Sequence, residues 1–185
     1  MAAEIPLYDP ELLEKFNLGE RHDLLKHDKS LLARPLYLSD YKRGYLELLA
    51  SLTDVGNISY EQFKEQFYRM MSCPGTYYCT VIVDIALDRI VGASTLLMER
   101  KFIRNCALRA RLEDVVVSPH YRGKQLGRCI VEIVTNLGRA LGAYKMTLDC
   151  KDDLIPFYES LGYKKEPGNS NTLGIRYPTS KEAKL

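Results

Sequence analysis

Residues 113–130, with the sequence EDVVVSPHYRGKQLGRCI, decide the expected fold. Glu113 to Val117 look like a buried strand, and Ser118-Pro119 ends it. The loop from Arg122 to Gly127 is basic and glycine-containing, and from Leu126 apolar residues recur at three- and four-residue steps. The stretch therefore predicts a strand, a basic loop and the start of an amphipathic helix.

The junction between this loop and the helix is a candidate anion site. A helix N-terminus presents free N–H groups and the positive end of the helix dipole, so it attracts phosphate. Gly123 and Gly127 allow close backbone approach, and Arg122 and Lys124 add positive charge. The spacing is neither G-x-G-x-x-G nor a Walker loop, which favours a pyrophosphate held by backbone. The alternative interpretation is an ordinary solvated turn.

Outward from this stretch, helical and strand patterns alternate along the chain. A helix is expected from the possible cap Ser39-Asp40 through Leu52, and a second one starts at Ser59, where Gln62 completes a capping box. The remaining expected elements are an antiparallel meander over 77–84, 89–99 and 107–117, a helix over 126–141, a strand over 144–150, a helix over 153–161 and a strand over 171–177. This order predicts one mixed α/β layer structure. We expect residues 1–32 to form an N-terminal extension and residues 33–185 a single domain.

Composition limits the function classes. The chain of 185 residues carries 26 basic and 24 acidic residues, and this net charge of +2 gives no reason to expect a nucleic-acid partner. Five scattered cysteines without a secretory signal predict reduced thiols in the cytoplasm. The three histidines show no metal-ligand spacing, so no metal is expected. No apolar stretch reaches the length of a transmembrane segment.

The basic loop carries a resemblance to a known superfamily. Arg122-Gly123-Lys124-Gln125-Leu126-Gly127 resembles the [QR]-x-x-G-x-[GA] acetyl-CoA loop of the GCN5-related N-acetyltransferases (GNAT), with Gln125 in place of the motif's internal glycine. The resemblance extends from Arg34 to Tyr177 and implies the GNAT fold, a central, mostly antiparallel twisted sheet with helices on both faces. It also implies acetyl-CoA as co-substrate. The implied cofactor-binding residues are Asp114, Val115, Val116, Val117, Arg122, Gly123, Lys124, Gln125, Leu126, Gly127 and Tyr158.

Five blocks narrow the resemblance to the glucosamine 6-phosphate N-acetyltransferase family. They are 52–56, 99–103, 113–117, 144–150 and 157–159. The resemblance implies acetylation of the amine of glucosamine 6-phosphate on the route to UDP-N-acetylglucosamine, by a homodimer whose last strand sends an arginine into the partner's site. Any membrane contact on endomembranes would be peripheral. The implied catalytic residues are Asp149, Tyr158 and Glu113, and the implied substrate-binding residues are Thr53, Lys101, Phe102, Ile103, Arg104, Glu113, Asp114, Tyr144, Lys145, Asp149 and Arg176.

Physical chemistry gives these residues roles and also plainer alternatives. Asp149 would orient and polarise the amine, Tyr158 would donate to the leaving sulfur, and the cations would bind the substrate phosphate. An aspartate after a strand is more commonly a turn cap, and most tyrosines only pack. Two other functions stay open: a GNAT enzyme for another amine, on a protein or small molecule, and a non-catalytic acyl-CoA-binding module.

Overall fold

The computed structural model describes residues 4–16, 18, 25, 28–121, 123–168 and 173–175. Arg122 and Arg176, both predicted site residues, lie outside the described residues. The chain divides into two compact units, Met1–Leu148 and Asp149–Leu185.

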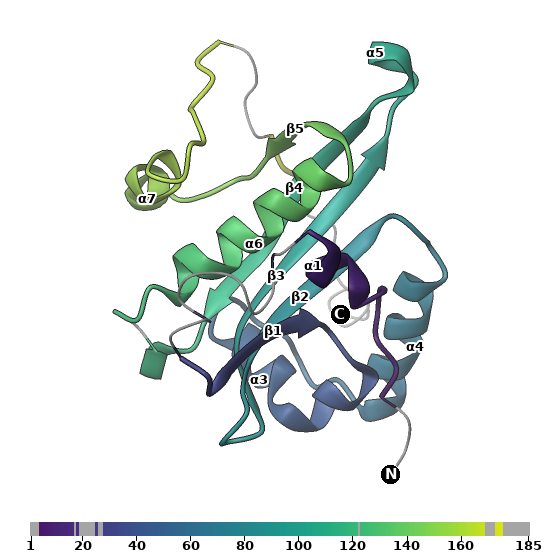
Figure 1. Cartoon of the computed structure of the whole chain (residues 1–185), viewed down its shortest axis with the longest axis vertical. Helices are drawn as coiled ribbons and strands as arrows, with labels where there is room; N and C mark the ends of the chain where they lie inside the picture. Colours follow the sequence, from purple (N-terminus) through teal and green to yellow (C-terminus); the bar gives the residue numbers. More distant parts are fainter. Residues whose placement is uncertain are drawn as a thin grey trace, which may run out of the picture. The chain divides into compact units, whose positions relative to one another are not determined.

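A five-stranded sheet forms the centre of the first unit (Figure 1). Its strands lie in chain order, with β1 to β4 antiparallel and β5 parallel to β4, so the predicted mostly antiparallel sheet is confirmed. The strands are β1 (Leu31–Pro35), β2 (Tyr77–Asp84), β3 (Arg89–Arg100), β4 (Leu108–Val117) and β5 (Ala143–Thr147).

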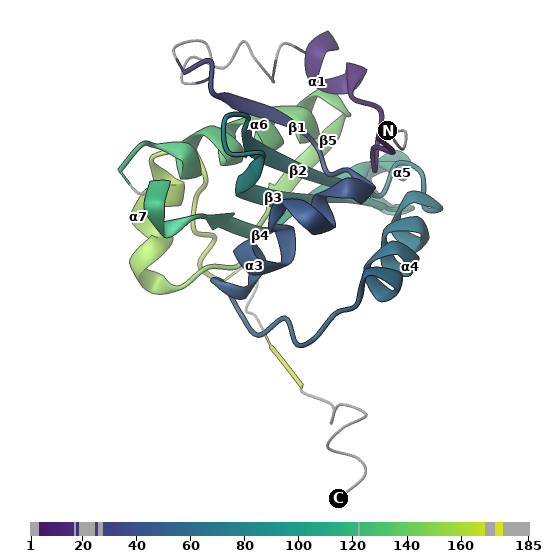
Figure 2. The same ribbon diagram turned by 90° about the horizontal axis from the view of Figure 1, so that it is seen from below.

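Helices cover both faces of this sheet, as predicted. Figure 2 shows α6 on one face, with α3 and α4 on the other. The helical segments are α1 (Glu11–Lys15), η1 (Leu38–Arg43), α3 (Tyr45–Ala50), α4 (Tyr60–Met71), α5 (Ile103–Cys106), η2 (Pro119–Tyr121) and α6 (Leu126–Ala140). Among the described residues, no helix is long and apolar enough to cross a membrane.

Helix α6 forms the core with the sheet because its apolar stripe is continuous. Gly138 lets the helix approach closely, since a Cβ placed there would lie 2.5 Å from Met146 Cε of β5. The buried side chains of the stripe are Leu126, Ile130, Ile133, Val134 and Leu137. The end of β4 and the loop that precedes α6 are therefore fixed to a rigid layer.

The helix predicted from Ser39 to Leu52 is wrong in one respect. Gly44 adopts φ 80°, a left-handed conformation, and divides the segment into η1 and α3. Asp40 does cap, but from inside the first turn, because its carboxylate accepts from the N–H of Tyr37 at 2.7 Å. The capping box of Ser59 and Gln62 before α4 is confirmed, with the Gln62 carboxamide accepting from Ser59 N–H at 2.8 Å.

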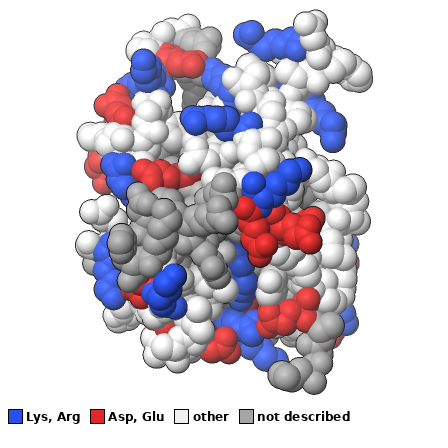
Figure 3. Space-filling view, viewed as in Figure 1, with Lys and Arg blue, Asp and Glu red and all other residues white. Residues whose placement is uncertain are grey.

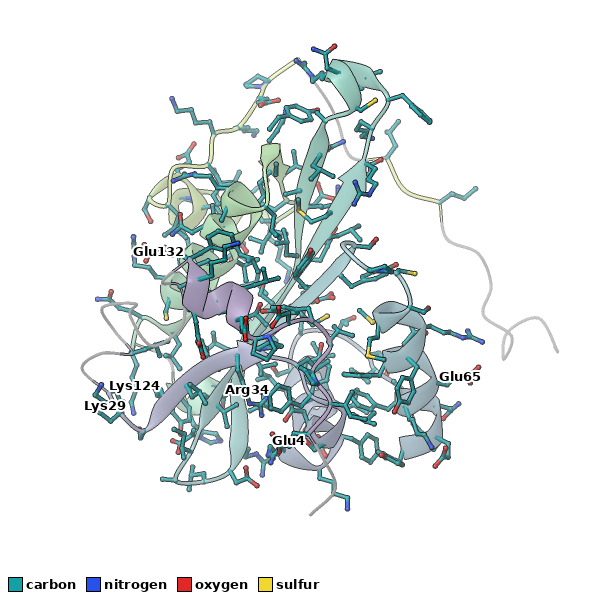
Figure 4. The ribbon with its side chains drawn as sticks, turned by 45° about the vertical axis from the view of Figure 1, so that its right-hand side comes forward. Glu4, Lys29, Arg34, Glu65, Lys124 and Glu132 are labelled. Carbon is teal, nitrogen blue, oxygen red and sulfur yellow. The ribbon has the colours of Figure 1, made fainter. Side chains whose placement is uncertain are left out.

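A buried ion pair joins β1 to η1. Arg34 donates to both carboxylate oxygens of the fully buried Asp40, at 2.7 and 2.8 Å. Arg43 extends the network from Asp40 to Glu4 and Asp88, with 2.7 Å to each of the last two (Glu4 and Arg34 are labelled in Figure 4). This network therefore ties the N-terminal segment to the β2–β3 hairpin.

Within the first unit, the N-terminal segment packs against the sheet and the segment that follows β1. Leu7 N–H donates to the Leu36 carbonyl at 2.8 Å, and the Tyr8 hydroxyl is hydrogen-bonded to Thr80 Oγ1 at 2.8 Å. Leu7, Tyr8 and Leu13 are buried. The division at residue 32 stays a prediction.

The second unit begins immediately after β5. The expected strand over 144–150 ends at Thr147, and the expected helix over 153–161 is a short helical pair, η3 (Asp152–Leu154) and α7 (Ile155–Glu159). Of the predicted last strand, 171–177, the structure describes only residues 173–175, and these are not in a strand.

Candidate active site

Within the described part of the chain, no strand pairs with the second half of β4 on its β5 side. Strand β5 pairs with Leu108 to Arg111 only, and no pairing with β5 continues beyond Arg111. On that side, backbone groups of Glu113 to Val117 therefore have no ladder partner from β5 and are available to an extended ligand, as at any unpaired strand edge.

A β-bulge changes the direction of the backbone in this open segment of β4. Opposite β3, Ala93 pairs with Val116 and Thr95 pairs with Glu113, so Ser94 faces two residues of β4. Asp114 adopts φ 53° there, which a non-glycine residue rarely does. Such bulges bend a strand and change the direction of side chains and N–H groups, and they are frequent beside active sites. The run Glu113 to Val117 is therefore not the simple strand that its sequence indicates.

The Asp114 carboxylate lies beside a buried polar chain. It is hydrogen-bonded to Thr95, whose hydroxyl lies 3.5 Å from Cys79 Sγ, and Cys79 is in turn hydrogen-bonded to Tyr45. Desolvation, followed by the charge of Glu113, raises the pKa of Asp114 although Thr95 opposes the shift. No sequence pattern predicts Tyr45, Cys79 and Thr95 as site residues, because only the folded register brings them to β4.

This raised pKa predicts a pH-dependent gain in stability for Asp114→Asn. The unfolded carboxyl loses its proton near 3.8 and the folded one at higher pH, so ionisation at Asp114 destabilises the fold as pH rises through that window. We expect the melting temperature of the variant to exceed that of the parent at pH 7. The gain should be no more than about 3 °C, because water screens this exposed residue. Below pH 3.8 the two melting temperatures should be equal. Thermal unfolding across pH measures this. An equal gain at both pH values would show that charge is not the cause.

Glu113 is held by an ion pair on its own strand. Arg111 Nε donates to the Glu113 carboxylate, and both side chains are partly exposed. The pair was not predicted, although residues two apart in a strand share one face and the alternation would have found it. The Glu113 carboxylate therefore lies beside the bulge at Asp114 and is already paired with Arg111.

Two described residues of the predicted pyrophosphate loop, Gly123 and Gln125, adopt left-handed backbone conformations. Gln125, which replaces the motif's glycine, adopts the left-handed conformation with φ 58° that glycine would favour. That conformation costs a non-glycine residue about 1–2 kcal/mol. Gly123 also has φ 80°, and a Cβ added to it would meet nothing within 4 Å. The departure at Gln125 thus leaves the left-handed turn in place.

Helix α6 starts at Leu126, within the last two residues of this loop motif. No described side chain caps its first turn, so its N–H groups can bind an anion. The side chain of Leu126 is fully buried, and only its backbone could contact a ligand. Lys124 is exposed, with Nζ 4.9 Å from the ring centre of Tyr121.

Two of the predicted substrate-binding residues, Arg104 and Tyr144, lie together where the turn between β3 and β4 approaches β5. Arg104 lies over the ring of Tyr144, with its guanidinium carbon 5.1 Å from the centroid. Lys101 donates to Glu99, so it is already paired. Phe102 is 97% exposed and Ile103 64% exposed. The turn contains three consecutive left-handed residues, Arg104, Asn105 and Cys106.

Two further predicted substrate residues lie on other elements of the first unit. Lys145 of β5 is in register with Arg109 of β4, next to Tyr144. Thr53 is exposed in the loop between α3 and α4. The structure records no contact that joins Thr53 to the β3–β4 turn within the described part of the chain.

The second unit holds the other predicted catalytic residues. Asp149 is exposed and follows β5 by two residues, and its charge, with those of Asp152 and Asp153, adds to the burial that raises the pKa of Cys150. Tyr158 of α7 is buried, with its ring 5.0 Å from Phe157 and 5.8 Å from Tyr163. Burial, then Cys150 and Tyr163, raises the pKa of Tyr158 to about 12. Its hydroxyl therefore keeps its proton at neutral pH and can donate it.

Basic and acidic side chains are interspersed over the described residues on the face in Figure 3. Within the described ranges, no group of three or more His, Cys, Asp or Glu is placed to hold a metal ion. The expectation of no metal stays a prediction.

Comparison with known proteins identifies the family of this chain. The profile described as acetyltransferase (GNAT) family matches residues 41–163. A probable glucosamine 6-phosphate N-acetyltransferase from Drosophila melanogaster is 50% identical over 185 residues, 96% of this chain and 84% of the relative. A glucosamine 6-phosphate N-acetyltransferase from Dictyostelium discoideum is 38% identical over 139 residues, 75% of this chain and 88% of the relative.

A solved structure agrees with these relatives. The crystal structure of glucosamine-6-phosphate N-acetyltransferase from Arabidopsis thaliana has a TM-score of 0.76 and 32% identity, and the match covers 80% of this chain and 99% of that chain. The chain therefore belongs to the acetyltransferase (GNAT) family and, within it, to the glucosamine 6-phosphate N-acetyltransferases.

Proposed function

We propose that this protein transfers the acetyl group of acetyl-CoA to the amine of D-glucosamine 6-phosphate, giving N-acetyl-D-glucosamine 6-phosphate and CoA. The observation that carries the proposal is the open, bulged half of β4 leading into an uncapped helix N-terminus. We infer from the family resemblance that the reaction lies on the route to UDP-N-acetylglucosamine.

The first unit would supply the binding path for acetyl-CoA. Backbone groups of Asp114 to Val117 would hold the pantetheine arm along the open edge of β4. The loop from Arg122 to Gly127 and the N–H groups at the start of α6 would hold the pyrophosphate. Bound there, acetyl-CoA supplies the activated acetyl group as a thioester. A backbone N–H group whose direction is changed by the bulge would stabilise the negative charge that develops on the carbonyl oxygen of the thioester.

Acid and base roles fall to different residues. Asp149 would orient the sugar amine and accept its proton, with Glu113 and Asp114 beside the reacting centre. Tyr158, which stays protonated because of its raised pKa, would donate to the departing sulfur. Tyr158→Phe tests this role: it should lower kcat for thiol release by a larger factor than it weakens the binding of acetyl-CoA, and an unchanged kcat would contradict the role.

The substrate phosphate would bind to cations at the β3–β4 turn and at β5. Lys101, Arg104 and Lys145 are suited to a dianion because charge-assisted hydrogen bonds are among the strongest available. The contact between Arg104 and Tyr144 supports a shared location for the turn and the strand. Exposed Phe102 and Ile103 would flank the sugar.

A homodimer with shared sites is part of the proposal. Arg176 would act in the partner's site, as the family resemblance implies. In that case Arg176→Ala mixed in equal amounts with Asp149→Asn should recover about a quarter of the parental activity, because half of the dimers are mixed and each holds one intact site. Recovery is measured after subunit exchange. Activity no higher than that of the separate variants would contradict a shared site.

The overall function is tested by following free thiol from acetyl-CoA with three acceptors: glucosamine 6-phosphate, a lysine peptide and a small aliphatic amine. We expect turnover with the sugar phosphate alone. Preference for either other amine would indicate a different GNAT acceptor. Binding of acetyl-CoA without thiol release from any acceptor would indicate a non-catalytic acyl-CoA-binding module.

We also infer a cytoplasmic location. All five cysteines are free in the structure, which suits a reducing compartment. Fractionation of cells would test this, and recovery from a secretory compartment would contradict it.

A further inference from the structure

The loop between β4 and α6 is anchored to a distant hairpin by one side chain. The Tyr121 hydroxyl donates to Asp84 Oδ2, across a separation of 37 residues. Asp84 ends β2, where it pairs with Leu31 of β1 and Arg89 of β3. Its second carboxylate oxygen accepts from Leu87 N–H at 3.1 Å. The acceptor is therefore fixed on the sheet before Tyr121 binds to it.

Tyr121 also organises the loop around itself. Its N–H donates to the Ser118 carbonyl at 2.9 Å, and its own carbonyl accepts from Lys124 N–H at 3.3 Å. Lys124 Nζ lies 4.9 Å from the centre of the Tyr121 ring, so the same residue orients a cation of the loop. Lys124, labelled in Figure 4, is exposed on this loop.

A loop of this shape needs an external anchor. Gly123 and Gln125 both occupy left-handed conformations, and helix N-terminal N–H groups bind an anion well only when the chain before them is already in place. We propose that Tyr121 and Asp84 form a latch that pre-organises the pyrophosphate loop, and that both are positioning residues for acetyl-CoA. This inference rests on the proposed function, because it takes acetyl-CoA as the ligand of the loop.

The charge state of the latch is stable around neutrality. The hydrogen bond from Tyr121 lowers the pKa of Asp84, and the same bond raises the pKa of Tyr121 to about 12. Asp84 is therefore ionised and Tyr121 protonated under working conditions, so the donor and acceptor keep their roles.

The test is Tyr121→Phe, which removes the hydroxyl and keeps the ring beneath Lys124. We expect the KM for acetyl-CoA to rise about tenfold, because a hydrogen bond to a charged group is lost, and kcat to stay within about twofold. With acetyl-pantetheine, which lacks the pyrophosphate and nucleotide, the KM should not change. Asp84→Asn should act in the same direction, and the double variant should be little worse than either single one. Tyr60→Phe, on an exposed tyrosine of α4, is the matched control and should alter neither constant.

The outcomes separate the latch from the proposed function. An unchanged KM for acetyl-CoA in Tyr121→Phe overturns the latch, and so does an equal rise for both cofactors, which would show a general structural role. Lys124→Ala should raise the KM for acetyl-CoA in any case. If Lys124→Ala has its effect while Tyr121→Phe has none, only the latch fails. If neither has an effect, the assignment of the loop to acetyl-CoA fails as well.

Discussion

Asp149→Asn should reduce kcat by about 10²- to 10⁴-fold, the range in which a positioned acid or base contributes. The carboxylate can accept a proton from the sugar amine and the amide cannot, while size and shape are nearly kept. Because Asp149 is exposed, we expect the melting temperature to stay within about 2 °C. Steady-state thiol release and thermal unfolding measure the two quantities.

Asp153→Asn is the matched control for Asp149→Asn. Both aspartates are exposed, both belong to the second unit, and both add to the charge that raises the pKa of Cys150. The control should change kcat by less than about threefold, since general surface charge effects are small. A near-parental rate in Asp149→Asn, or an equal loss in both variants, would remove Asp149 from its catalytic role.

Asp40→Ala should cause the largest loss of stability among single substitutions in the ion network. Arg34 is only 8% exposed and donates to both carboxylate oxygens of Asp40, so the variant leaves a buried guanidinium without its counter-ion. Removal of one partner of a buried pair typically costs about 3–5 kcal/mol. For a chain of this length that corresponds to a melting temperature roughly 10 °C lower.

Glu65→Ala is the control for Asp40→Ala, because Glu65 pairs with Arg69 at the same 2.7 Å with both side chains more than 60% exposed. Glu65 is labelled on α4 in Figure 4. We expect its removal to cost at most about 0.5 kcal/mol. Similar shifts for the two variants, measured by thermal or denaturant unfolding, would mean that the Arg34–Asp40 pair contributes no more than a surface pair.

Periodicity in the sequence was sufficient for the elements that form the core. The apolar steps from Leu126 predicted α6, and the runs over 77–84 and 89–99 predicted β2 and β3 with nearly their observed bounds. These features are local, since one face of each element must be apolar to be buried. The resemblance in the loop then added the fold class.

Features that depend on pairing between distant segments were not predicted. The bulge at Asp114 arises from the register of β4 against β3, and the sequence Glu113 to Val117 carries no sign of it. Asp84 and Tyr121 are 37 residues apart and meet only in the folded sheet. By contrast, Gly44 was a visible signal for a helix break, and alternation along β4 would have placed Arg111 beside Glu113.

The central claim concerns the acceptor, and the ratio of kcat/KM for glucosamine 6-phosphate to kcat/KM for glucosamine tests it most directly. If Lys101, Arg104 and Lys145 bind the phosphate, loss of that group should lower kcat/KM by about 10²-fold or more, because several charge-assisted hydrogen bonds disappear together. Equal values of kcat/KM for the two sugars would contradict the phosphate site and, with it, the assignment of glucosamine 6-phosphate as the substrate.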